Sequence, residues 1–178
     1  TVFLKEMYPQ WVAYHRWWYE KRDDDINGIG EFGATDGTVE AAAWESGMDN
    51  AIRFDDAKMK ENGPDAWSFD QESVDLNAYL AYEYRLLKTF ADVLNIPFDE
   101  PNYTKDVADY FFDDEVGFFF DKRLSDGSYI RELGSEAYIP FWTEIASTEQ
   151  MDRSIIYFKD STKFATYIPF PTIAADNP

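Results

Sequence analysis

Apolar residues recur at helical spacing through most of this 178-residue chain. The first series covers residues 4–18, with apolar positions three or four residues apart, and it predicts a helix near the start of the chain. Pro9 would lie in the first turn of that helix or kink it. The clearest period covers residues 76–94, where leucines share one side and charged residues the other. This long amphipathic helix is predicted to end at residues 95–97, Asn-Ile-Pro.

The second half of the chain has shorter patterns. Three further helices are predicted, at residues 103–112, 138–146 and 148–158. The aromatic runs 118–120 and 129–131 flank a turn-forming stretch and predict a β-hairpin. Residues 167–171 are expected to be extended, because residues before proline avoid the helical region. The fold class predicted from the pattern is therefore mainly α with one small hairpin.

Several polar residues are expected to form turns and helix caps between these elements. A turn is predicted at residues 62–64, and Ser73 or Asp70 is expected to cap the long helix. Three acidic residues near the hairpin are interpreted as turn formers and not as an oxygen-ligand site: Asp113, Asp114 and Asp121.

The most informative stretch follows a run of alanines at residues 41–43, which have high helix propensity. Gly47 is expected to end that helix, because glycine readily adopts the conformation of a helix end. Asp49 would then lie on a loop beside the partial negative charge of the helix terminus. If Asp49 is also partly buried against Trp44, its pKa should be raised, and a protonated carboxyl group can donate to a leaving group. The alternative is an ordinary acidic residue on a surface loop.

A second motif lies upstream, where Asp23, Asp25 and Asn27 alternate and Gly28 follows. This is the beginning of a calcium loop, with oxygen ligands at positions 1, 3 and 5 and a turn-forming glycine at 6. The backbone carbonyl of Ile29 would be the ligand at position 7. The alternative is a solvated acidic turn.

The calcium loop departs from an EF-hand at position 12, where Ala34 replaces the bidentate glutamate. A site would therefore have to be completed by another residue. Glu31, at position 9 of the loop, and Glu72, further along the chain, are the two candidates.

The composition narrows the range of partners. Apolar residues make up 45 % of the chain, which indicates a globular protein. The net charge of −19 argues against nucleic acid or an anionic membrane as partner, and it suits a neutral substrate and bound cations. The aromatic fraction of 19 % offers faces that stack on sugar rings, although most of these residues should fill the core.

Cysteine and histidine add no candidate functional residues. Cysteine is absent, so disulfides and thiolate metal sites are ruled out. The compartment stays open, with a periplasmic or secreted location favoured over a cytoplasmic one. His15 is the only histidine and lies in an aromatic-rich helix, so we expect it to be packed and hydrogen-bonded instead of catalytic.

Three motifs in order resemble glycoside hydrolase family 63, the processing α-glucosidase family, which is related to trehalases. They are residues 22–35, the acid-bearing residues 44–50 (Trp-Glu-Ser-Gly-Met-Asp-Asn) and residues 71–75 (Gln-Glu-Ser-Val-Asp). The resemblance implies an (α/α)6 barrel and inverting hydrolysis of α-glycosides, with Asp49 as the general acid. It also implies that Glu72 closes a structural calcium site. Trp44, Glu45 and Asn50 are then the nearby candidates for shaping the sugar pocket.

The family places the general base, a glutamate, near the end of its barrel, after a Trp-Arg-Gly motif. Neither follows residues 167–171. We therefore interpret residues 1–178 as one partial domain, an arc of the barrel. The expected partners are an α-linked oligosaccharide or glycoside and the remaining portion of the enzyme, which carries the base. Without that portion, the chain is expected to be inactive and prone to aggregation.

Two other functional classes stay open at this point. The first is a non-catalytic helical module that binds calcium or carbohydrate without turnover. The second is a related hydrolase of different specificity, either trehalase-like or of the mannosylglycerate type.

Overall fold

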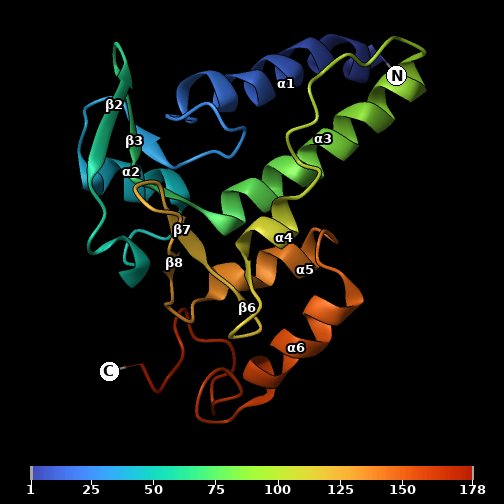
Figure 1. The fold of residues 1–178 in the computed structure, drawn as a ribbon. Helices are drawn as coiled ribbons and strands as arrows, with labels where there is room; N and C mark the ends of the chain where they lie inside the picture. The colour runs from blue at the N-terminus through green and yellow to red at the C-terminus, as the bar shows by residue number, and fades with distance from the viewer. Residues whose placement is uncertain (1, 178) are drawn as a thin grey trace.

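The structure is a computed structural model that describes residues 2–177 (Figure 1). Its two longest helices, α1 (Val2–Lys21) and α3 (Val74–Leu94), pack against each other on one side of the molecule. Tyr8 and Val12 of α1 are buried in one cluster with Leu87 and Ala91 of α3. The helix predicted at residues 4–18 is thus confirmed, and Pro9 lies inside α1 and not in its first turn.

Helix α3 shows how local chemistry sets the ends of an element. It begins after Ser73, whose backbone is extended but whose side chain makes no capping bond. It ends at Asn95, which takes the left-handed conformation at φ 55° and donates its backbone N–H to the carbonyl of Ala91. Asparagine tolerates this conformation better than most residues, so the predicted stop at residues 95–97 is confirmed.

The short helix α2 (Val39–Ser46) positions the candidate acid. The side chain of Thr38 accepts a hydrogen bond from the N–H of Ala41 and caps its first turn. Gly47 ends it with φ 69°, as predicted from the sequence. A single 3₁₀ turn, η1 (Ile52–Phe54), follows directly.

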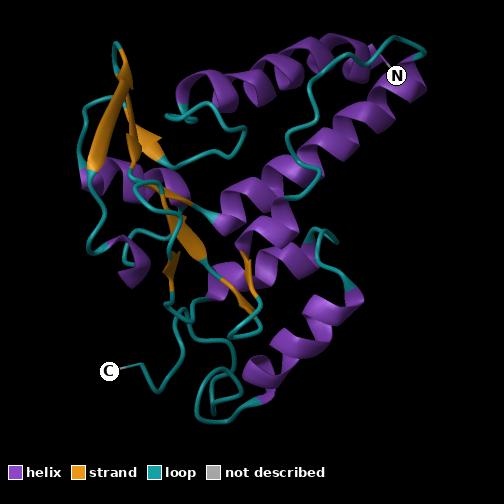
Figure 2. Ribbon diagram, viewed as in Figure 1, coloured by secondary structure: helices purple, strands orange, loops and turns teal. Residues whose placement is uncertain are grey.

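Three small antiparallel sheets lie beside the helices (Figure 2). In the first, β3 (Ala66–Phe69) lies between β1 (Gly33–Ala34) and β2 (Met59–Gly63). In the second, β7 (Asp121–Arg123) lies between β4 (Gln71–Glu72) and β8 (Tyr129–Ile130). The third pairs β5 (Phe112–Asp113) with β6 (Phe118–Phe119).

The aromatic hairpin differs from its prediction. Tyr129 pairs with Lys122 of β7, so the first strand of the hairpin begins at Asp121 and not at residue 118. Phe118 and Phe119 pair instead with β5 and are fully buried. Asp121 is therefore a buried strand residue and not the turn former that its sequence neighbours indicated. Asp113 does form a turn, since it accepts the N–H of Glu115.

The later helices are shorter than predicted, except the last. Helix α4 covers Val107–Phe111, and the pattern at 138–146 folds as a 3₁₀ turn, η2 (Ser135–Tyr138), followed by α5 (Ile139–Trp142). Helix α6 (Thr148–Lys159) is confirmed and begins with a capping box between Ser147 and Gln150. Residues 167–171 lie outside helices and strands, but the extended conformation predicted for them is wrong, because the chain bends there and Phe170 takes the left-handed conformation at φ 59°.

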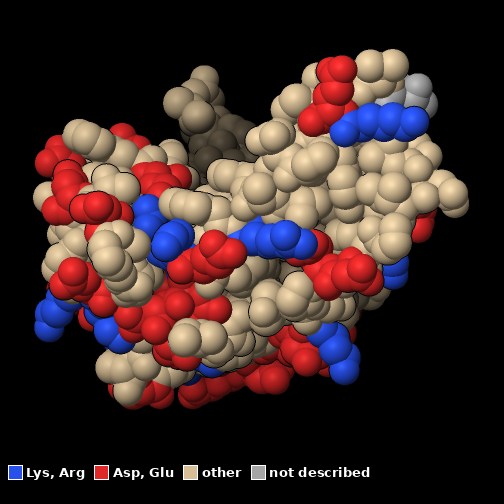
Figure 3. All heavy atoms as spheres, turned by 90° about the horizontal axis from the view of Figure 1, so that it is seen from above, with Lys and Arg blue, Asp and Glu red and all other residues tan. Residues whose placement is uncertain are grey.

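The buried side chains form three clusters. The largest is rich in phenylalanine and joins α4, β5, β6 and α6, while another gathers Trp18, Phe32, Phe54 and Phe69. Acidic side chains gather over part of the surface in Figure 3, with lysine and arginine side chains among them. Among the described residues, no helix is both long and apolar enough to cross a membrane.

Candidate active site

The loop after α2 is held in place by short-range hydrogen bonds. Ser46 donates from Oγ to the carbonyl of Ala43 at 2.6 Å and accepts the N–H of Met48 at 2.9 Å. The N–H of Ala51 then bonds to the carbonyl of Met48 at 2.9 Å. These bonds fix the backbone on both sides of Asp49, so the fold defines where its side chain leaves the loop.

The carboxyl group of Asp49 lies on the surface. Asp49 and Asn50 are both exposed, and Trp44 is itself 59 % exposed on α2. The expected burial of Asp49 against Trp44 is therefore wrong, because the indole ring does not cover the loop. Any environment that excludes water from Asp49 must come from a substrate or from other protein surface.

Two adjoining hollows lie at this loop. The larger, of about 280 Å³, is lined by residues 47–51, which include Asp49, and by Thr172. The smaller, of about 30 Å³, shares Asn50, Ala51 and Thr172 with it and extends to Arg53 and Glu136. The candidate acid therefore borders a concave surface whose inner end carries charged groups.

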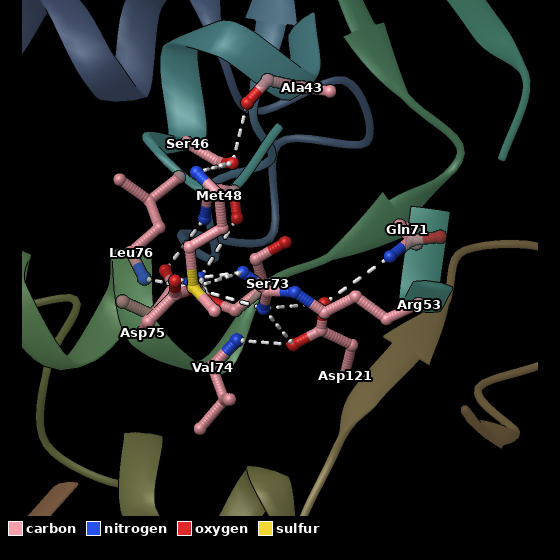
Figure 4. Close-up of polar contacts among 12 residues, drawn as sticks. Ala43, Ser46, Met48, Arg53, Gln71, Ser73, Val74, Asp75, Leu76 and Asp121 are labelled. Carbon is pink, nitrogen blue, oxygen red and sulfur yellow. Dashed lines mark hydrogen bonds and ion pairs between the residues drawn. The ribbon is translucent and has the colours of Figure 1, made fainter. Parts of the chain in front are cut away.

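Beneath the loop lies a buried cluster of charges centred on Arg53, which is 3 % exposed (Figure 4). Its guanidinium group is 2.8 Å from Asp75 Oδ2 and 3.0 Å from Asp121 Oδ2. Asp121 also accepts the N–H of Val74 at 2.8 Å and the side-chain amide of Gln71 at 3.2 Å. Because Arg53 also lies 3.7 Å from Met48 Sδ, it joins the acid loop to the start of α3 and to β7.

Electrostatics keep Arg53 charged. Burial opposes its charge, but Asp121 and Asp75 raise its pKa above the usual range. Glu136, also within this group, has its pKa raised to about 7 by burial, an effect that Arg53 partly offsets. Sequence reasoning missed Arg53, Asp75 and Glu136, because these partners are far apart in the chain and no local pattern marks a buried arginine.

Glu45 is engaged within the protein. Its carboxylate receives two bonds from Arg22, at 2.8 and 2.9 Å, and one from the N–H of Gly33 at 2.6 Å. A bidentate arginine pair of this kind is geometrically specific. Glu45 thereby ties α2 to the end of α1 and to β1, and its predicted contact with a sugar stays a prediction, as do those of Trp44 and Asn50.

The acidic loop brings its predicted ligands together. Carboxylate oxygens of Asp23, Asp25 and Glu31 all lie within 4.8 Å of one another. Asn27 donates from its side-chain amide to Asp25 at 3.2 Å and to Glu72 at 2.6 Å. Both residues that the sequence left as alternatives, Glu31 and Glu72, therefore lie beside this loop.

Glu31 supplies the sharpest evidence about this cluster. It is fully buried, its Oε2 accepts the N–H of Asp24 at 3.0 Å, and its Oε1 has no partner among residues 2–177. Burial raises the pKa of Glu31 to about 10 and also raises that of Glu72, in the latter case against hydrogen bonds from Tyr110 and Asn27. Grouped carboxylates with an unsatisfied oxygen fit a hard cation, which these residue types prefer to bind. The ligand role of the Ile29 carbonyl stays a prediction.

His15 is buried and its Nδ1 lies 2.8 Å from Glu83 Oε2, so it joins α1 to α3. This confirms the packed, hydrogen-bonded role expected from the sequence.

Comparisons with known proteins agree with this architecture. The family model described as "Mannosylglycerate hydrolase MGH1-like glycoside hydrolase domain" matches residues 1–178. An uncharacterized protein of Borreliella burgdorferi is 26 % identical over 117 residues, which are 59 % of this chain and 23 % of that protein.

Two solved structures from Thermus thermophilus are also similar. An uncharacterized conserved protein has a TM-score of 0.74 at 19 % identity, over 98 % of this chain and 51 % of its own. A GH63 mannosylglycerate hydrolase in complex with glucose has a TM-score of 0.73 at 19 % identity, over 98 % of this chain and 49 % of its own. This chain thus spans about half the length of these structures, and the similarity establishes a mainly α fold of the kind found in part of an (α/α)6 barrel.

Proposed function

We propose that this chain, which belongs to the family of mannosylglycerate hydrolase MGH1-like glycoside hydrolase domains, supplies the general acid for inverting hydrolysis of an α-glycosidic bond. The observation that carries the proposal is the position of Asp49. Its carboxyl group lies on a hydrogen-bonded loop at the edge of a hollow of about 280 Å³.

The chemistry requires two carboxyl groups on opposite faces of the sugar. An inverting glycosidase holds a general acid and a general base about 6.5–9.5 Å apart, with the attacking water between base and sugar. Asp49 would protonate the glycosidic oxygen as the bond to the anomeric carbon breaks. A sugar and further protein surface over Asp49 would remove water from its carboxyl group, and loss of water favours the neutral form that carries the proton.

The general base is proposed to lie in the remaining portion of the enzyme. This fits the observation that the chain spans about half of the similar solved structures. Residues 1–178 would then be one arc of the barrel, active only together with the rest. Its substrate would be an α-linked glycoside, either an α-glucoside or, as the names of the similar hydrolases favour, a compound of the mannosylglycerate type.

The substrate class and stereochemistry can be tested together. The complete enzyme, assayed on maltose, trehalose and mannosylglycerate, should cleave an α-linked substrate and release the β-anomer first, because water attacks from the opposite face. Proton NMR of the first product, recorded before mutarotation, is the measurement. Release of mannose as the α-anomer from mannosylglycerate, or of two α-glucose molecules from trehalose, would contradict inversion. Sugar binding without turnover would favour the non-catalytic module.

We also propose a structural calcium ion held by Asp23, Asp25, Asn27, Glu31 and Glu72, with the Ile29 carbonyl as a further ligand. The support is the convergence of the Asp23, Asp25 and Glu31 carboxylates, the hydrogen bond from Asn27 to Glu72, and the unpartnered buried oxygen of Glu31. A bound calcium ion would neutralise the cluster and tie the acidic loop to the segment that begins α3. That segment also carries Asp75, so the ion would steady the base of the acid loop.

Removal of calcium should lower the melting temperature of the complete enzyme. An ion that binds only the folded state contributes about 2.7 kcal/mol when its free concentration is a hundred times the dissociation constant. Asp25→Ala should abolish the response of the melting temperature to EDTA. The matched control is Asp24→Ala, since Asp24 pairs with Lys60 outside the cluster and its loss should leave the EDTA response intact. A melting temperature indifferent to both calcium and EDTA would show that no such site exists.

A further inference from the structure

Glu136 is a buried acid that the proposed reaction does not use. It lies in η2, is 3 % exposed, and receives no hydrogen bond on its carboxyl group from another residue within the described part of the chain. Its own backbone N–H and the charge of Arg53 offset part of the cost of burying this group, and the rest of that cost calls for a physical reason. Its position suggests one, because Glu136 lines the small hollow under Asn50 and Ala51, directly beside the acid loop.

The backbone at Gly134 leaves room for the carboxyl group of Glu136. Gly134 lies against it so closely that a Cβ atom at residue 134 would collide with both carboxyl oxygens. The segment is anchored by hydrogen bonds on both sides, since Ser135 donates its N–H to the carbonyl of Thr172 and Ala174 donates to Leu133. Glycine at 134 therefore lets Glu136 occupy one defined position between Arg53 and the hollow.

The hollow has the size and polarity for one water molecule. Its volume of about 30 Å³ exceeds the roughly 10–15 Å³ that a single water requires. Asn50, Arg53 and Glu136 line it, so it offers both hydrogen-bond donors and hydrogen-bond acceptors. A water held there would connect Glu136 with the acid loop.

We propose that Glu136 is a positioning residue of the acid loop, which it holds through a water molecule in the hollow that it shares with Asn50 and Ala51. The proposal rests on the proposed function, because it assigns to Glu136 the task of presenting Asp49 to the glycosidic bond. Glu136 does not touch the reacting atoms and acts through the loop.

This position also makes the loop sensitive to pH. The charged and titratable groups around Glu136 are Arg53 from η1, Asp75 from α3, Asp121 from β7, and Glu132 and Tyr138 from its own segment. Arg53 is already paired with two carboxylates, so it compensates a third negative charge only in part. Burial raises the pKa of Glu136 to about 7, above its unfolded value. Protonation of Glu136 therefore contributes fully to stability below about pH 4.3. This contribution is lost as pH rises through 7.

The test compares Glu136→Gln, Glu136→Ala and Gly134→Ala in the complete enzyme. Glutamine mimics the protonated carboxyl group, so Glu136→Gln should keep kcat within about threefold and remove the part of the pH dependence near pH 7. Glu136→Ala and Gly134→Ala should each lower kcat roughly 10–100-fold with little change in KM, because a loop displaced by about 1 Å misplaces the acid. The matched control is Glu149→Gln, an exposed glutamate on α6, which should behave as wild type.

Several outcomes would overturn the proposal. One is an unchanged kcat in Glu136→Ala, and another is a Glu136→Gln variant that keeps the wild-type pH profile near pH 7. The melting temperature between pH 4 and 9 gives a readout apart from activity, since Glu136→Gln should flatten its decline between about pH 4.3 and 7. A wild-type enzyme without turnover would overturn the proposed function itself, whereas normal wild-type turnover with an unaffected Glu136→Ala would overturn only the role of Glu136.

Discussion

Asp49→Asn, made in the complete enzyme, is expected to lower the turnover of unactivated α-glycosides by roughly 10²–10⁴-fold, the usual contribution of a general acid. Asparagine is nearly isosteric with aspartate but has no proton of useful acidity. The side chain of Asp49 is exposed and its loop is held by Ser46, Met48 and Ala51. The variant should therefore stay folded, with an unchanged melting temperature.

The leaving group of the substrate separates loss of the acid from loss of binding. Glycosyl fluorides need little protonation, so their hydrolysis by Asp49→Asn should fall much less than that of a disaccharide. The matched control is Asp65→Asn, because Asp65 is an exposed aspartate at the β2–β3 turn with φ 55°, a conformation that asparagine accepts. Near-normal cleavage of a disaccharide by Asp49→Asn would remove Asp49 from the acid role.

The local elements of this site could be read from the sequence because neighbouring residues determine them. Gly47 ends α2 and Asn95 ends α3 for reasons that lie within one helical turn. The alternation of Asp23, Asp25 and Asn27 likewise determines that their side chains crowd one loop. By contrast, the hairpin of β2 and β3 was not predicted, since the mostly polar residues of Met59–Gly63 lack the alternation of a strand and only the turn is visible.

The contacts beneath the acid loop could not be predicted, because they join distant segments. Arg53 and Asp121 are 68 residues apart, and the sequence around Asp121 resembles a turn. Only the pairing of β7 with β4 brings Asp121 to the start of α3, where it meets Arg53. The exposure of Asp49 was missed for a similar reason, since a tryptophan five residues away need not cover it.

Loss of Arg53 is expected to be the most destabilising single change in this region. Arg53→Met keeps much of the volume but leaves Asp75 and Asp121 buried without a counter-charge. Breaking a buried ion pair by removing one partner typically costs about 3–5 kcal/mol, because the remaining charge is uncompensated. Urea unfolding of the complete enzyme measures this change in the free energy of unfolding.

The matched control is Arg123→Met, because Arg123 lies on the same strand as Asp121 but its pair with Asp56 is 3.9 Å long and solvent-exposed. Such a surface pair contributes about 0–1 kcal/mol, so its loss should be nearly silent.

The pH dependence distinguishes an uncompensated charge from a simple packing defect in Arg53→Met. Burial already raises the pKa of Asp121 against the charge of Arg53, and loss of the arginine raises it further, so the buried carboxyl group should take up a proton. Arg53→Met should therefore become more stable as pH falls toward 4 and less stable as pH rises. Adding Asp75→Asn or Asp121→Asn to Arg53→Met should restore part of the lost stability at pH 7. A cost that is equal at pH 5 and pH 8, and that neither asparagine reduces, would mean that Arg53 acts through packing alone. The acid loop would then lack the electrostatic support described here.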